Sequence, residues 1–131
     1  KILELPNIRL LPLESDTFHL IDNSKAVASV TGTSSWEAVV RGVPSLVFGH
    51  CWFKHCKGVF YVDSYECVKN VIDKIINGFE VNKTEVQLFA KVVEENSFKG
   101  VVGGPGLRKH FNITDYQNGK AHSEAIRAII S

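Results

Sequence analysis

The fold is decided by residues 26–48, which read AVASVTGTSSWEAVVRGVPSLVF. Residues 26–30 are a continuous run of small, largely apolar side chains, which is typical of a strand covered on both faces. A turn of capping residues then leads into a short helix that ends at Gly42, because Pro44 forbids its return. Residues 45–48 read as a second strand of the buried type. This order of strand, helix and strand predicts a parallel sheet with right-handed crossovers.

Elements on either side extend the alternating pattern. Residues 8–11 read as a short strand, and Ser15 or Asp16 can cap the helix that follows it. Residues 59–62 are expected to form a further, partly exposed strand. The fold class is therefore α/β, with a small parallel Rossmann-like sheet of three or four strands flanked by helices, like the later half of a larger doubly wound domain.

From about residue 64 the chain is expected to be helical. Ser64 caps one helical segment, and Thr84 caps the next. Residues 99–108 are rich in glycine and read as a loop, before a last helix over about residues 118–130. The apolar positions of that last helix that are expected to face inward are Ala125, Ile126, Ile129 and Ile130.

The length and amino-acid composition limit the classes of protein to which the chain can belong. The 131 residues allow a single domain over 1–131, and 44% hydrophobic with 22% charged residues is typical of a globular chain. The formal net charge of +1 provides no field to steer polyanions, so we expect no nucleic-acid partner. Three cysteines, with no signal segment and no apolar stretch long enough to span a bilayer, predict a cytoplasmic location. The chain has no methionine and starts at Lys1, so we expect a fragment of a longer protein.

The turn after residue 30, which leads into the helix that ends at Gly42, is a better candidate for a binding site than the loop after residue 48. Parallel strands place their carboxyl ends along one edge, and ligands bind there. Gly32, Thr33 and Ser34 bring backbone N–H groups to a helix N-terminus, where the dipole favours a phosphate. Glu37, one turn into the helix, is placed to accept hydrogen bonds from vicinal ribose hydroxyls. The alternative is that Ser34 or Ser35 simply caps the helix, with Glu37 completing a capping box.

Several short motifs occur together within residues 27–53. They are Thr31-Gly32-Thr33, Trp36-Glu37-Ala38, Arg41-Gly42, Pro44, the apolar strand leading to Phe48-Gly49, and the pair Trp52-Phe53. This combination, with the lead-in LPNIRLLP, resembles the nucleotide-sugar half of bacterial capsule polysaccharide biosynthesis proteins. That family is related to the transferases of the sugar Kdo and has the two-domain GT-B glycosyltransferase fold. The resemblance covers about half of the chain and implies the later part of a GT-B C-terminal domain.

The resemblance implies a role and a set of site residues. The chain would be the donor-binding part of a glycosyltransferase in capsular or surface polysaccharide biosynthesis. Its substrate would be a nucleotide sugar, CMP-linked or UDP-linked, with no further cofactor and no tightly bound metal. The residues that would hold the donor's phosphate are Thr31, Gly32, Thr33 and Ser34, and Glu37 would bind the ribose. Those that would lie near the sugar or the facing domain are His50, Trp52 and Phe53.

The resemblance also implies what the chain needs from elsewhere. In this fold the catalytic carboxylate comes from the other half, and a His-Pro phosphate contact lies upstream. The sequence has no His-Pro pair, so we do not expect the chain to be active alone. The polysaccharide acceptor would bind through the other half, in a protein peripheral to an inner-membrane biosynthetic complex. Arg41 and Gly42 look structural, as a helix C-terminus that suits a cation and a left-handed turn.

A second function class remains open at this point. The same pocket could hold a nucleotide or a phosphorylated sugar without turnover, serving the regulation or the export of the polymer. In that case the chain would be a non-catalytic binding module rather than part of an enzyme.

Histidine and cysteine pairs offer a competing interpretation. His50-Cys51 and His55-Cys56 place four soft ligands within seven residues, but structural zinc sites draw their ligands from two separated segments. We therefore expect no metal site. A thiol nucleophile at Cys51 or Cys56, with a neighbouring histidine as base, is disfavoured because adjacent residues seldom point at each other.

Overall fold

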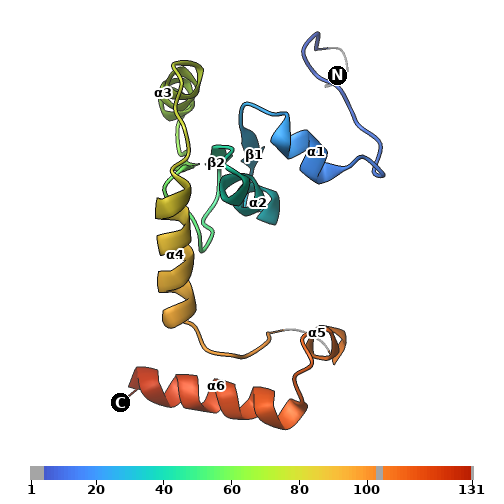
Figure 1. Cartoon of the computed structure of the whole chain (residues 1–131), viewed down its shortest axis with the longest axis vertical. Coiled ribbons are helices and arrows are strands. Elements are labelled where there is room, and N and C mark those ends of the chain that lie inside the picture. The colour runs from blue at the N-terminus through green and yellow to red at the C-terminus, as the bar shows by residue number, and fades with distance from the viewer. Residues whose placement is uncertain (1–4, 103–104, 131) are drawn as a thin grey trace. The chain divides into compact units, whose positions relative to one another are not determined.

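The structure is a computed structural model, and it describes residues 5–102 and 105–130. The chain divides into two compact units. The first ends at Phe89 and holds every strand of the described residues, whereas the second begins at Ala90 and is built from helices and loops. Figure 1 shows the order of these elements along the chain.

A three-stranded parallel sheet is the centre of the first unit. Its strands are β1 (Val27–Ser29), β2 (Ser45–Val47) and β3 (Val59–Tyr61), in the spatial order β1-β2-β3. Ala28 aligns with Leu46, which aligns with Phe60. The helix α2 (Thr33–Arg41) joins β1 to β2 and lies beside them in Figure 1. The prediction of a small parallel α/β sheet flanked by helices is thereby confirmed.

The sheet is covered on both faces, because neighbouring side chains of a strand point to opposite sides. On one face Val47 packs in a cluster with Val39 of α2 and with Val86 of α4 (Lys83–Glu95). On the other face Leu46 packs with Val71 of α3 (Tyr65–Ile76). The sheet is therefore a middle layer between helices.

Two of the expected helix starts are confirmed and one is wrong. The Asp16 carboxylate accepts hydrogen bonds from the first turn of α1 (Thr17–Asp22), and the Ser64 hydroxyl accepts one from Cys67 N at 3.2 Å. In α4 the cap is Asn82 rather than Thr84. The Asn82 Oδ1 atom accepts from the backbone N of Thr84 at 3.0 Å, because the carboxamide sits one position before the helix and can fold back onto it.

The expected strand over residues 8–11 is also wrong. These residues are not in a strand, and Leu10 and Leu11 are 71% and 55% exposed. A strand of this length is stable only when a neighbour satisfies its backbone groups, and in residues 5–102 and 105–130 no strand pairs with it. Apolar content alone therefore did not make it part of the sheet.

The end of α2 is fixed as expected. Gly42 has φ of 95°, a left-handed conformation that favours glycine, and its N–H closes the helix. Arg41 donates to both carboxylate oxygens of Asp22, and its guanidinium lies 4.9 Å from the ring centroid of Phe18. The hydrogen bond with Arg41 lowers the pKa of the Asp22 carboxyl. These contacts hold α1 against α2, which confirms a structural role for both residues.

The second unit contains more helix than expected. The helix α5 (Pro105–His110) begins inside the segment expected to be a glycine-rich loop, and proline is favoured at a first helical position. Gly103 and Gly104 of that segment lie outside the described residues. The helix α6 (Asp115–Ile130) starts before residue 118, because Thr114 and Gln117 form a reciprocal capping box.

The apolar side chains at the end of α6 do not face inward. Ile126, Ile129 and Ile130 are 58%, 83% and 78% exposed, and Ala125 is half-buried. The contacts of α6 within its unit include a ring contact, since the His122 and Phe98 centroids are 5.1 Å apart, and hydrogen bonds of Asn118. The Asn118 carboxamide accepts from Val101 N at 2.7 Å and donates to Val101 O at 3.1 Å.

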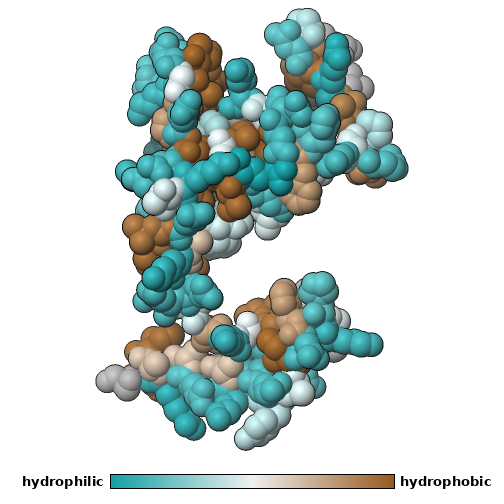
Figure 2. Space-filling view, viewed as in Figure 1, coloured by the Kyte–Doolittle hydropathy of each residue, from teal (hydrophilic) through white to brown (hydrophobic). Residues whose placement is uncertain are grey.

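Apolar surface is exposed in the first unit as well. Figure 2 shows such surface on α3 and α4, where Ile76 and Leu88 are 75% and 62% exposed. None of the helices in residues 5–102 and 105–130 combines the length and the apolar character needed to cross a bilayer.

Candidate functional site

The carboxyl ends of the strands form the candidate site, which we call the carboxyl edge. It consists of the turn after β1 with the start of α2 (residues 30–37), the loop 48–54 after β2 and residues 62–64 after β3. Backbone hydrogen bonds join two of these segments, because Gly49 N donates to Val30 O at 2.8 Å and Phe48 N donates to Ser29 O at 3.1 Å. The edge is therefore a connected structure rather than separate loops.

A serine network shapes the turn after β1. Ser29 Oγ accepts from Gly32 N at 3.2 Å and lies 2.6 Å from Ser35 Oγ. Gly32 is the N-cap of α2, and the cap residue makes no side-chain hydrogen bond to the helix. The capping-box alternative for Ser34, Ser35 and Glu37 is therefore wrong, since the Ser35 hydroxyl is buried against Ser29 and the Ser34 hydroxyl caps nothing.

The first turn of α2 leaves backbone donors available. Thr33 N and Ser34 N donate to no acceptor in the part of the chain that the structure describes. Thr31, Gly32 and Thr33 are exposed and Ser34 is half-buried. The amide dipoles of a helix add partial positive charge at this end, so these two N–H groups form a favourable place for an anion.

The turn does not require a glycine at position 32. Its φ of −70° suits any residue, and a Cβ there would meet Ser29 Cβ and Ser34 Oγ at 3.5 Å, an ordinary contact. The missing side chain therefore faces protein atoms and is not what opens the turn to a ligand.

Gly49 is the glycine on which the carboxyl edge depends. A Cβ at this position would lie 2.8 Å from Thr31 Cγ2 and 3.2 Å from Val30 O. Because one of these atoms belongs to the backbone, the turn and the loop could not keep their spacing around a larger residue. This requirement was not predicted from the sequence, in which a glycine directly after the strand expected over residues 45–48 was the available signal.

The Glu37 carboxylate has no hydrogen-bond partner among the described residues. Glu37 is half-buried on α2, and it makes no ion pair in the part of the chain that the structure describes. A carboxylate in this state is available to accept hydrogen bonds from hydroxyl groups.

His50 contacts two residues that sequence reasoning did not select. Its ring stacks on Tyr61 with centroids 5.1 Å apart, and its Nδ1 atom lies 2.9 Å from Lys54 Nζ. Tyr61 is the last residue of β3, so the loop after β2 is folded over the end of the neighbouring strand. The four-residue spacing of His50 and Lys54 is visible in the sequence, but it does not indicate their shared contact with Tyr61.

Trp52 and Phe53 lie in a different environment from His50. They pack in an aromatic cluster with Trp36 of α2 and Phe89 of α4, where the Trp36 and Trp52 centroids are 4.9 Å apart. Phe53 is 1% exposed and belongs to the core, so its side chain is not available to contact the sugar or the facing domain as expected. Trp52 remains 57% exposed, as a cover over this cluster.

The structure does not support a nucleophilic cysteine or a metal site in the loop after β2. Burial, with a smaller effect of Glu85, raises the pKa of the Cys56 thiol, which keeps it protonated and poorly nucleophilic. In residues 5–102 and 105–130 no three His, Cys, Asp or Glu side chains are grouped to hold a metal ion.

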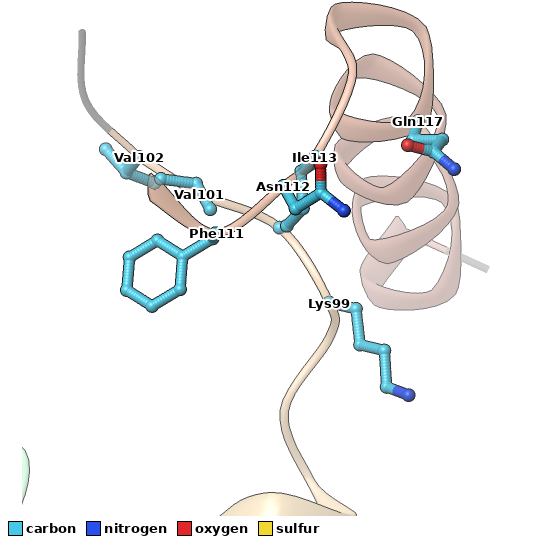
Figure 3. A pocket seen from close by; sticks show the side chains of 8 residues that line it. Lys99, Val101, Val102, Phe111, Asn112, Ile113 and Gln117 are labelled. Atoms are coloured by element: carbon cyan, nitrogen blue, oxygen red, sulfur yellow. The ribbon is translucent and has the colours of Figure 1, made fainter. Parts of the chain in front are cut away.

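Two concave surfaces accompany these residues. A groove of about 510 Å³ at the ends of β2 and β3 is walled by Phe48, Tyr61 and Tyr65, with Asp63 and Ser64 as polar groups. In the second unit a pocket of about 690 Å³ is lined mainly by apolar residues. Figure 3 shows Val101, Val102 and Phe111 on one side of it and Gln117 of α6 on the other. The first groove belongs to the carboxyl edge and the second pocket does not.

Comparisons with family models, with curated proteins and with solved structures find no match to this chain. The site must therefore be interpreted from its own chemistry.

Proposed function

We propose that the chain is the donor-binding part of a glycosyltransferase that acts in bacterial capsular or surface polysaccharide biosynthesis. It would be the later part of a Rossmann-like C-terminal half of the GT-B fold. The observation that carries this proposal is the pair of uncommitted amides, Thr33 N and Ser34 N, at the carboxyl edge of a parallel sheet. In such sheets this edge is where nucleotides bind.

The amides would act on the leaving group of the transfer. An acceptor hydroxyl attacks the anomeric carbon, the bond from that carbon to the donor's phosphate oxygen breaks, and the nucleotide leaves with the bonding electrons. Thr33 N and Ser34 N are fixed where negative charge grows on that phosphate, so they stabilise the transition state without reorganising. The base that takes the acceptor's proton, and the acceptor site, belong in this proposal to another part of the protein.

The remaining groups of the edge fit a nucleotide sugar. Glu37 accepts hydrogen bonds from the ribose hydroxyls, and the Thr31 and Ser34 hydroxyls supplement the amides. The nucleotide sugar is the substrate, CMP-linked or UDP-linked, and no cofactor or metal takes part. The proposal places this reaction in the cytoplasm.

A non-catalytic module that binds a nucleotide or a phospho-sugar is the second candidate. The chemistry of the described carboxyl edge favours it, since the edge offers amides, hydroxyls and the Lys54 ammonium rather than a carboxylate hydrogen-bonded to a histidine. Turnover of a nucleotide sugar by the chain together with an upstream half would exclude this candidate.

The proposal is tested by removing one amide without disturbing the helix. Thr33 is the first residue of α2, where proline is favoured, and Gly32 has the extended backbone that proline requires before it, with ψ of 148°. Thr33→Pro therefore deletes one N–H, whereas Thr33→Ala keeps it and deletes the hydroxyl. Losing a hydrogen bond to a charged group costs about 1.5–3 kcal/mol, which is roughly tenfold or more in affinity.

The readout is a thermal-shift screen with CMP, UDP and GDP, followed by calorimetry with the best nucleotide. We expect a shift with the wild type and with Thr33→Ala, and a much smaller one with Thr33→Pro. Equal binding by Thr33→Pro and Thr33→Ala, or no shift with any nucleotide, contradicts the proposal.

A further inference from the structure

A lysine and a histidine side chain form a pair beside the proposed phosphate site. Lys54 Nζ is 2.9 Å from His50 Nδ1. An ammonium group has only donors, so His50 Nδ1 must accept this hydrogen bond and the ring proton must be on Nε2. The pair therefore offers the two remaining N–H groups of Lys54 and the Nε2–H of His50 to a ligand.

Tyr61 holds both members of the pair in place. The His50 ring stacks on the Tyr61 ring at an interplanar angle of 23°, and Lys54 Nζ lies 5.7 Å from the same ring centroid. An ammonium over an aromatic face is attracted to it, so the two side chains are organised before any ligand arrives. Pre-organised donors lose less entropy when they bind.

The charge of Lys54 has no anionic partner in the described residues. Arg41 pairs with Asp22 and Lys91 with Glu95, whereas no carboxylate lies within ion-pair distance of the half-buried Lys54. The only carboxylate that lines the groove beside Tyr61, within the described residues, is Asp63. A half-buried ammonium whose contacts are a histidine and an aromatic ring is suited to an oxyanion from a ligand.

The pair is close enough to α2 for one ligand to reach both places. His50 directly follows Gly49, which packs against Thr31 two residues before the start of α2. Tyr61 ends β3, which is separated from β1 by β2 alone, so two strand spacings of about 4.8 Å lie between them. The carboxyl ends of β1 and β3 are therefore about 10 Å apart, which is less than the length of a nucleotide sugar.

We propose that His50 and Lys54 bind a second anionic group of the ligand whose first phosphate lies at the N-terminus of α2. That group is an oxyanion, either a further phosphate or a carboxylate on the sugar. This inference rests on the proposed function, because it assigns the second contact of the same ligand.

Three probes separate the possible sources of the second group. CMP carries one phosphate, CDP adds a second phosphate, and CMP-linked N-acetylneuraminate adds a sugar carboxylate. The whole 131-residue chain is titrated with each probe by calorimetry. We expect CDP or the sugar nucleotide to bind more tightly than CMP, and the tighter of the two identifies the group that the pair binds.

Lys54→Met tests the pair itself, because methionine keeps most of the side-chain length and removes the charge. We expect about tenfold weaker binding of the doubly anionic ligand and unchanged binding of CMP. Lys54→Arg should restore most of the affinity. Lys57→Met is the matched control, since Lys57 is an exposed lysine of the same loop, and it should change neither value.

The outcomes distinguish this inference from the proposed function. If the wild type binds CMP but Lys54→Met binds all three probes as the wild type does, the second site is wrong and the donor site stands. An equal loss for CMP and the doubly anionic ligands also overturns it. If no probe binds to the wild type, and UMP, UDP and UDP-linked glucuronate do not bind either, the proposed function fails and this inference fails with it.

Discussion

The two units of the chain differ in what holds their helices. In the first unit, α2, α3 and α4 each bury at least one residue against the sheet, whereas α6 of the second unit buries none. The contacts of α6 within the second unit instead include the hydrogen bonds of Asn118 to Val101 and the ring contact of His122 with Phe98. The helices of both units have apolar residues at similar spacing in the sequence. They differ in whether a sheet lies against their apolar face and covers it.

The largest expected effect follows from this difference. Phe53→Ala, in the core of the first unit, should lower the free energy of unfolding by about 3–5 kcal/mol, because it leaves a cavity. Ile129→Ala, on α6, should change it by no more than about 0.5 kcal/mol, since that side chain is 83% exposed. Chemical denaturation followed by circular dichroism measures both. Similar losses in the two variants would break the distinction between the units.

Alanine substitutions at one glycine of each unit should have smaller effects on the free energy of unfolding. Gly49→Ala should cost about 1–3 kcal/mol and weaken nucleotide binding, because its methyl group would press on Thr31 and on the backbone of Val30. Gly119→Ala is the control in the second unit, where a Cβ meets nothing within 4 Å. It should stabilise α6 by up to about 1 kcal/mol, because alanine is the better helix former. A neutral Gly49→Ala would show that the carboxyl edge is more adaptable than its spacing implies.

The smallest effect concerns the contact between α1 and α2. Arg41 lowers the pKa of Asp22, so this pair stabilises the fold above the unfolded-state value of about 3.9 and stops doing so as the pH falls through the lower folded value. Both groups are exposed, so we expect a slight effect. Asp22→Asn should be slightly less stable than the wild type at neutral pH and equally stable near pH 2. A constant difference across that range would contradict the linkage.

The sequence was sufficient where local chemistry and burial agree. Residues 26–48 gave strand, helix and strand because a buried run, a turn and a glycine at the helix end all favour the same structure. Asp16, Ser64 and Gly42 acted as expected for the same reason. These features depend on neighbours in the chain, which a sequence displays directly.

The expectations that were wrong depend on contacts with distant residues. Residues 8–11 and the end of α6 are apolar, but no layer in the described residues covers them. The capping box of α6 could have been read from Thr114 and Gln117, which are three residues apart. The pairing of His50 with Lys54 over Tyr61 needs the position of β3 relative to the loop after β2, which no spacing reveals.

The most direct test of the central claim is an NMR titration of the backbone amides of the labelled chain with CMP or UDP. If Thr33 N and Ser34 N bind the phosphate, their N–H signals move downfield together and saturate with the affinity measured by calorimetry. Signals of the second unit, such as that of Val102, should not move. Saturating shifts confined to the second unit, with Thr33 and Ser34 unchanged, would contradict the account.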